Sequence, residues 1–195
     1  SFGFGGVEGF FFTNSDSGVV NATTLGGSDI DAITDITVDA SGNIIVCGYS
    51  KSLAVNAVVT YDGFIAKFDA DHNLLWQKYT KYSTGSDYIY AVKCSADGTI
   101  VAVGHTGSYN SGEMFIAKFG ADGSTVWHYN FGHSAGFEAG YDVTTDSSNN
   151  IYVVGETTST GVTYGDYDVF VAKFSSVGAI TWQRDIGGTG TEHAN

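Results

Sequence analysis

The segment Phe64–Trp76, F-I-A-K-F-D-A-D-H-N-L-L-W, occurs three times in this chain. Phe115–Trp127 has the sequence F-I-A-K-F-G-A-D-G-S-T-V-W, and Phe170–Trp182 has F-V-A-K-F-S-S-V-G-A-I-T-W. In each copy the Trp follows the first Phe by twelve residues. Self-similarity at a fixed spacing is the signature of a repeat protein. The sequence therefore predicts repeated structural units, and it says more about architecture than about function.

Each repeat contains four short apolar stretches separated by turn-forming residues. Runs rich in β-branched and aromatic residues, bounded by Gly, Asn, Asp and Ser, are typical of β-strands. We therefore expect an antiparallel four-stranded meander in each repeat. In the first copy the expected strands are Ile33–Val38, Ile44–Tyr49, Gly63–Phe68 and Leu74–Lys78.

The second strands, such as Ile44–Cys47 and Ile100–Val103, are apolar on both faces, which predicts that each sheet is covered on both sides. Four-stranded units at this period fit β-propeller blades better than a sandwich or a solenoid. The sequences D-A-S-G-N-I-I-V-C-G-Y at Asp39–Tyr49 and D-S-S-N-N-I-Y-V-V-G-E at Asp146–Glu156, with D-G-F-I-A-K-F and N-L-L-W following the first, resemble the seven-bladed β-propeller repeat family. The resemblance covers residues 26–195. It implies a large secreted or surface protein and no defined activity.

The expected fold is an all-β, propeller-type array of three complete blades and an N-terminal half-blade. Residues 1–25 are assigned to an outer half-blade or closing strands, residues 26–80, 81–131 and 132–186 to the three blades, and residues 187–195 to the start of the next blade or a closing strand. Trp76, Trp127 and Trp182 are expected at equivalent core positions. The residues expected to be buried are Ile36, Val38, Ile44, Val46, Val92, Ala102, Val143 and Val153.

The chain is strongly acidic, with 8 Lys and Arg against 21 Asp and Glu and a net charge of −13. This charge argues against nucleic acid and anionic membranes as partners. The sequence also has no apolar run of the length that a transmembrane helix needs. We expect no cofactor.

Two motifs suggest chemistry by their letters alone. Gly132–Gly136, G-H-S-A-G, matches a nucleophile elbow around Ser134, but that motif needs a following helix, and a strand-like segment follows here. Asp69, Asp71 and Asn73 have the spacing of the first calcium-loop ligands, yet the required Gly and the final Glu are missing. We interpret the two as an inter-blade connection and a hairpin turn. No metal site is expected, and none is indicated by His72, His105, His128, His133 or His193.

Other residues allow more than one interpretation. Cys47 and Cys94 fall in facing strands of neighbouring blades. They form either a disulfide or two small, buried apolar thiols. Asn21 begins the only N-x-[ST] sequon and accepts a glycan if the chain is secreted and the site exposed. A lysine recurs at one position of the third strand, as Lys67, Lys118 and Lys173, and is expected to be a solvated or snorkelling side chain.

Three functional hypotheses follow. The first is a non-enzymatic extracellular structural or adhesive module. The second is a glycan-binding module, because the variable loops between the second and third strands share one face, where Tyr61, Tyr109, Tyr164 and Tyr167 would stack on sugars. A propeller hydrolase is the third and most remote.

The number of repeats also suggests an assembly. Three meanders and a half-blade are too few to close a propeller ring. Ser1 is not an initiator Met, so we expect a processed or partial chain. The sequence therefore predicts either a piece of a longer propeller chain or the subunit of a head-to-tail fibre, in which the segment 9–25 complements the segment 187–195 of the next copy.

Overall fold

The computed structural model describes residues 13–14, 18–19, 29–51, 60–107, 112–132, 136–158, 167–187 and 193. A small hairpin of β1 (Thr13–Asn14) and β2 (Gly18–Val19) precedes three four-stranded antiparallel sheets. Among the described residues, no helix is long and apolar enough to cross a membrane. The first sheet comprises β3 (Asp31–Val38), β4 (Ile44–Ser50), β5 (Asp62–Phe68) and β6 (Leu74–Thr80); the second β7 (Ser86–Cys94), β8 (Ile100–Gly107), β9 (Glu113–Phe119) and β10 (Thr125–Phe131); the third β11 (Glu138–Thr145), β12 (Ile151–Thr157), β13 (Asp168–Phe174) and β14 (Ile180–Ile186).

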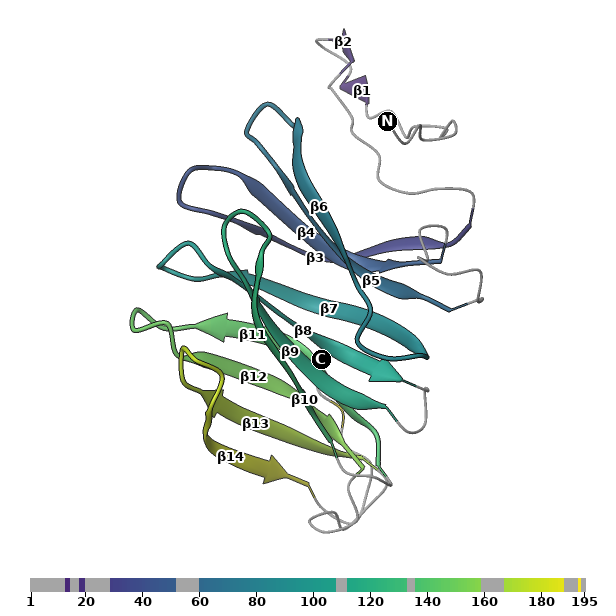
Figure 1. Ribbon diagram of the computed structural model, residues 1–195, viewed down its shortest axis with the longest axis vertical. Coiled ribbons are helices and arrows are strands. Elements are labelled where there is room, and N and C mark those ends of the chain that lie inside the picture. The colour runs from purple at the N-terminus through teal and green to yellow at the C-terminus, as the bar shows by residue number, and fades with distance from the viewer. Residues whose placement is uncertain are drawn as a thin grey trace.

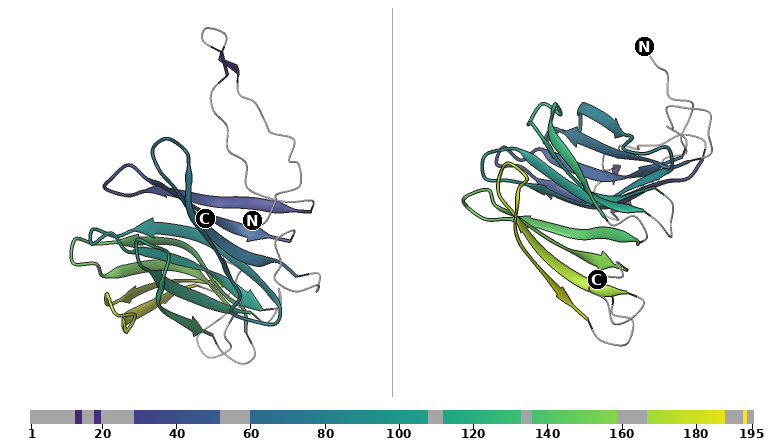
Figure 2. Two further views of the ribbon diagram at one scale, coloured as in Figure 1. Left: turned by 45° about the horizontal axis from the view of Figure 1, so that its top comes forward. Right: turned by 60° about the horizontal axis from the view of Figure 1, so that its bottom comes forward.

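Every sheet is a meander in which neighbouring strands follow one another in the chain. The sheets are stacked in chain order along the long axis of the molecule (Figure 1). The two turned views in Figure 2 show the same face-to-face order. The first strand of each later sheet packs across the face of the sheet before it, β7 against β3, β4 and β5, and β11 against β7, β8 and β9. The predicted array of blade-like sheets is thus confirmed, as an open array.

The tight turns are built on one repeated device. The Asp39 carboxylate accepts hydrogen bonds from the backbone N–H groups of Ser41 and Asn43 at 2.8 and 2.9 Å and from the Asn43 amide at 2.8 Å. Such bonds let an Asp side chain hold a chain reversal. The same three bonds recur at Asp69 and Asp146. The Asp69–Asn73 segment therefore forms a hairpin turn, as interpreted from the sequence.

The core lies between the sheets, and most of the expected residues are in it. Val46, Val92, Ala102, Val143 and Val153 are buried. Ile44 is half-buried.

For Ile36 and Val38 the prediction of burial is wrong, since they are 60% and 57% exposed. Both lie on β3, and the repeat places Ile36 where Val92 and Val143 lie in the later sheets, 3% and 4% exposed. Those two valines face a preceding sheet, whereas the outer face of β3 meets no described sheet. Alternation predicts the facing of a side chain but not whether a neighbour covers it.

The three Trp residues hold equivalent positions, as predicted. Each pairs across the sheet with the recurring lysine: Trp76 with Lys67, Trp127 with Lys118, and Trp182 with Lys173. Trp76 and Trp127 are half-buried against the next sheet, whereas Trp182, on the last described sheet, is 39% exposed.

The expected solvation of the recurring lysine is wrong for Lys67 and Lys118, which are buried. Lys67 forms an ion pair with Asp39 at 2.9 Å and donates to the carbonyl of Ala121 in the next sheet at 3.3 Å. Lys118 donates to the carbonyl of Ser176 in the third sheet at 3.4 Å. Because the next sheet in the array covers both lysines, each side chain meets protein instead of solvent, and the lysines join neighbouring blades.

Candidate functional site

The loops and inter-blade connections meet at one end of the array. The N–H of Asp87, where β7 begins, donates to the carbonyl of Tyr61 at 2.8 Å, just before β5. Glu138 donates likewise to Gly112 at 3.0 Å. In both cases the residue just before the third strand therefore lies beside the start of the next sheet, which agrees with the predicted shared face.

A carboxylate–hydroxyl pair fixes this end in every sheet. Asp31, Asp87 and Glu138 lie opposite Ser50, Thr106 and Thr157, each nineteen residues later. In all three pairs the hydroxyl donates to the acid, and the distance for Thr157 to Glu138 is 3.3 Å. The constant spacing of nineteen residues between acid and hydroxyl is the signal that marks these pairs in the sequence.

Half-buried tyrosines form a continuous row across the inner strands of the three sheets. The row consists of Tyr61, Tyr49, Tyr88, Tyr90 and Tyr141, and we call it the tyrosine row. Ring centroids lie 5.4 Å apart for Tyr61 and Tyr49, 4.9 Å for Tyr49 and Tyr88, 6.1 Å for Tyr88 and Tyr90, and 5.3 Å for Tyr90 and Tyr141. These separations are those of interacting aromatic pairs.

A bulge in each first strand places two members of the row. The register shifts between Ile89 and Ala91 and between Gly140 and Asp142, which leaves Tyr90 and Tyr141 out of the ladder. Bulges re-aim side chains and are common beside functional sites. In the first sheet the corresponding residue is Thr34, whose hydroxyl instead donates to the carbonyl of Ile89 at 2.6 Å. In the first sheet the row therefore has no member on β3.

The predicted ligand-binding tyrosines are partly joined to this row. Tyr61 belongs to it, and Tyr167 connects to it through a chain of ring contacts from Tyr88 through His105 and Phe137, with centroid separations of 5.7, 5.0 and 6.1 Å. His105 and Phe137 are buried. The predicted residues Tyr109 and Tyr164, the sequon Asn21 and the candidate Ser134 lie outside the described residues. Tyr49, Tyr88, Tyr90 and Tyr141 were missed because strand tyrosines look like core residues in a sequence.

A second feature is a cavity of about 290 Å³ between the second and third sheets. Its wall includes Phe131 of β10 and Phe170 and Phe174 of β13. Glu138 and Asp185 place carboxylates on it, and the Gln183 amide donates to Asp185 at 2.8 Å. The cavity thus combines aromatic surface with a few polar groups, as small-molecule sites do.

The two cysteines are free thiols, so the suggested disulfide is not formed. Cys47 is in the middle of β4, opposite Asp35 and Ile65, whereas Cys94 is the last residue of β7 at its turn. The two residues therefore lie at different heights in the interface. Burial raises the pKa of the Cys47 thiol to about 12, with a further increase from the nearby Asp35 carboxylate and an opposing hydrogen bond from Thr34.

No family model matches the chain. Among curated proteins, it is 22% identical over 239 residues to an uncharacterized WD repeat-containing protein, L264, of Acanthamoeba polyphaga mimivirus. That match covers 91% of this chain and 17% of the relative, so the chain spans a small part of it. Together with the three four-stranded sheets, this relative supports a repeat protein of the β-propeller type.

Among solved structures, the chain resembles a protein of unknown function from Bacteroides caccae, with a TM-score of 0.48 and 10% identity. The match covers 85% of this chain and 50% of that one.

Proposed function

We propose that this chain is a non-enzymatic adhesive module of an extracellular β-propeller repeat protein, and that it binds neutral glycans through the tyrosine row. The observation that carries the proposal is the continuity of the row across all three sheets, with each tyrosine only half-buried. The extracellular setting is supported by the resemblance to the seven-bladed repeat.

The row has the chemistry that a glycan requires. A pyranose has an apolar C–H face that packs on aromatic rings, and hydroxyl edges that exchange hydrogen bonds. Tyrosine offers an apolar ring and a polar tip, so it serves both. The Tyr141 hydroxyl already donates to Glu156 at 3.3 Å, which restricts the ring at that end of the row. The net charge of −13 disfavours anionic polysaccharides.

A glycan array probed with the chain tests this proposal. For any neutral glycan bound, Tyr49→Ala and Tyr90→Ala are expected to weaken affinity at least about tenfold, since one stacked ring contributes on the order of 1.4 kcal/mol. Tyr129→Ala is the control, because Tyr129 is 44% exposed on β10, outside the row. The absence of any bound glycan, or equal losses in all three variants, would overturn the proposal.

A second candidate function, self-association, is favoured by the outer face of the first sheet, on which no described sheet packs. Ile33, Ile36 and Val38 are more than half exposed there, while Ile89 and Val92, at the positions of Ile33 and Ile36 in the second sheet, are buried by a neighbour. A further blade packed on β3 would bury the same residues in the same way.

The contact between copies would nevertheless differ from the internal ones. Trp76 packs on Gly123 and Trp127 on Gly178, both glycines with positive φ in the turn between third and fourth strands. The equivalent residue of the first sheet is His72, which also has a positive φ but carries a side chain where the later sheets have glycine. Sedimentation of the isolated chain and of Ile36→Lys decides the matter: an oligomer lost in the variant supports self-association, and a monomeric wild type contradicts it.

A further inference from the structure

The cavity between the second and third sheets has a counterpart between the first and second sheets, and that counterpart is filled by Tyr82. The Tyr82 ring stacks on His128 with centroids 4.6 Å apart and an interplanar angle of 25°, and it lies 4.9 Å from Phe115. The repeat aligns Phe115 with Phe170 and His128 with Gln183, and both aligned residues line the cavity. The Tyr82 ring between the first and second sheets thus indicates what kind of group fits the cavity between the second and third sheets.

The surroundings of Tyr82 define what the gap accepts. The backbone N–H of Tyr82 donates to Asp87 at 2.7 Å, and the repeat aligns Asp87 with Glu138 of the cavity wall. Burial, with a contribution from the Asp87 carboxylate, raises the pKa of Tyr82 well above its usual value. The occupant of the first gap is therefore a neutral phenol beside a carboxylate.

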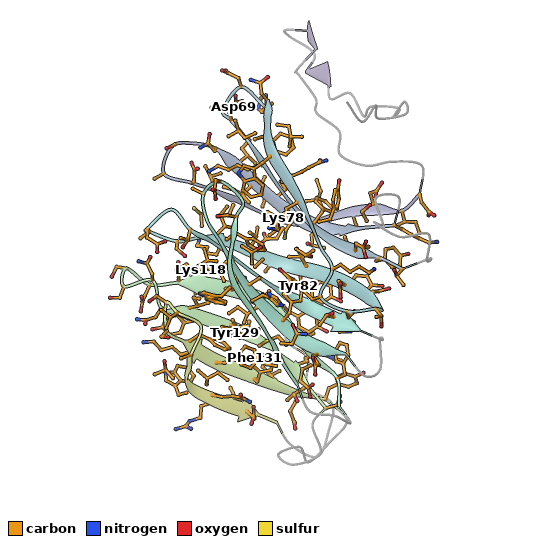
Figure 3. The ribbon with its side chains drawn as sticks, in the orientation of Figure 1. Asp69, Lys78, Tyr82, Lys118, Tyr129 and Phe131 are labelled. Carbon is orange, nitrogen blue, oxygen red and sulfur yellow. The ribbon has the colours of Figure 1, made fainter. Side chains whose placement is uncertain are left out.

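The cavity retains room for a ring even though its inner wall is bulkier. Met114 and Phe131 stand where the first gap has Gly63 and Thr80. The remaining volume is about 290 Å³, well above the roughly 150 Å³ of an apolar cavity that holds benzene. Figure 3 shows Tyr82 at the level of the second sheet and Phe131 lower, at the level of the third.

We propose that this cavity is a binding site for a small aromatic ring that carries a hydrogen-bond donor, a phenol in the place that the Tyr82 ring takes one repeat earlier. Phe170 and Phe174 provide the ring contacts, and Gln183, Glu138 and Asp185 receive the polar group. Two carboxylates and no Lys or Arg among the described lining residues favour a neutral or cationic ligand over an anion. The residue aligned with Tyr82 is His133, which lies outside the described residues.

The test uses the whole chain and 4-methylphenol, which is the tyrosine side chain itself. Titration followed by NMR is expected to show one site with a dissociation constant on the order of 1 mM. Tyramine is expected to bind at least as well, and 4-hydroxybenzoate at least tenfold more weakly. Tyr82→Ala is expected to raise the number of sites from one to two, because it opens the first gap to the same ligand.

Two variants at the rim locate the site. Ile180→Trp places an indole at the cavity mouth, where Ile180 is 46% exposed, and is expected to weaken binding at least tenfold. Thr125→Trp, at the aligned position of the second sheet, is the matched control and is expected to leave the affinity unchanged. The proposal is overturned if the wild-type chain binds no 4-methylphenol, if only Tyr82→Ala binds it, or if Ile180→Trp has no effect.

Discussion

The indole of Trp76 lies directly against Gly123 of the next sheet, so close that a Cβ on Gly123 would come within 2.9 Å of the ring. The indole Nε1 donates to the carbonyl of Ala121 in the same turn at 3.0 Å. The contact recurs one repeat later, where a Cβ on Gly178 would lie 3.3 Å from Trp127. A Trp from one blade and a glycine turn from the next thus form a joint that is repeated along the array.

Gly123→Ala is expected to destabilise the fold for two reasons that a control can separate. The φ of Gly123 is +81°, which costs an L-residue about 1–2 kcal/mol, and the added methyl would displace Trp76. Gly98 has nearly the same φ, +79°, but a Cβ there would meet nothing within 4 Å. In urea unfolding, Gly98→Ala should show the backbone cost alone and Gly123→Ala a larger loss. Equal losses would mean that the Trp joint does not contribute.

Trp127→Ala is expected to lower the free energy of unfolding by about 3 kcal/mol, the lower end of the range for large aromatic truncations, because the ring is half-buried. The ring packs against the core between the second and third sheets and stacks on Tyr129 with centroids 5.4 Å apart. The control is Trp182→Ala, because Trp182 is 39% exposed and no described sheet follows its own; its loss should be below about 1 kcal/mol. A Trp127 variant as stable as the Trp182 variant would mean that the packing of Trp127 against the third sheet does not stabilise the fold.

The fold was predictable from the sequence because the pattern that specifies it is repeated three times. Three copies of one pattern are enough to predict the strands, the turns and the equivalence of Trp76, Trp127 and Trp182. The burial of Ile36 was predicted wrongly because the residue has the right pattern but lacks the neighbour that covers its counterparts. Periodicity reports which face a residue is on, whereas burial depends on what packs there.

The candidate site was harder to predict from the sequence because it depends on contacts between repeats. Tyr61 was found from its loop, but Tyr49 and Tyr90 come together only when two sheets are stacked and a bulge turns one ring outward. The gap that Tyr82 fills is likewise a property of a pair of sheets. A sequence pattern within one repeat contains neither of these facts.

The two thiols are expected to differ strongly in reactivity. Cys47 is fully buried, and burial raises its pKa to about 12, so almost no thiolate forms at neutral pH. Burial raises the pKa of Cys94 as well, but this residue is only half-buried, so a reagent can reach its thiol more easily. Iodoacetamide at pH 8 should therefore modify Cys94 first and Cys47 only on unfolding, as mass spectrometry of peptides would show. Modification of neither residue without reductant would point to a disulfide.

Asp39→Asn is expected to destabilise the fold at neutral pH and to do so less as the pH falls. Burial alone would raise the pKa of Asp39, but hydrogen bonds from the Asn43 and Lys67 side chains and from the Asn43 and Ser41 backbone outweigh it and hold the pKa far below its usual value. A lowered folded-state pKa gives stability that is complete above the unfolded pKa of about 3.9 and is lost as the pH falls through the folded pKa. The difference in melting temperature between wild type and variant should thus be largest near pH 7 and shrink below pH 4. Asp71→Asn makes the same charge change in the turn between β5 and β6. It should show little difference at either pH, because Asp71 bonds to Asp69 through its backbone N–H, which the substitution leaves in place. A difference in melting temperature that stays constant from pH 7 to pH 3 would mean that the Asp39 carboxylate does not stabilise the turn between β3 and β4 or its contact with Lys67 of β5.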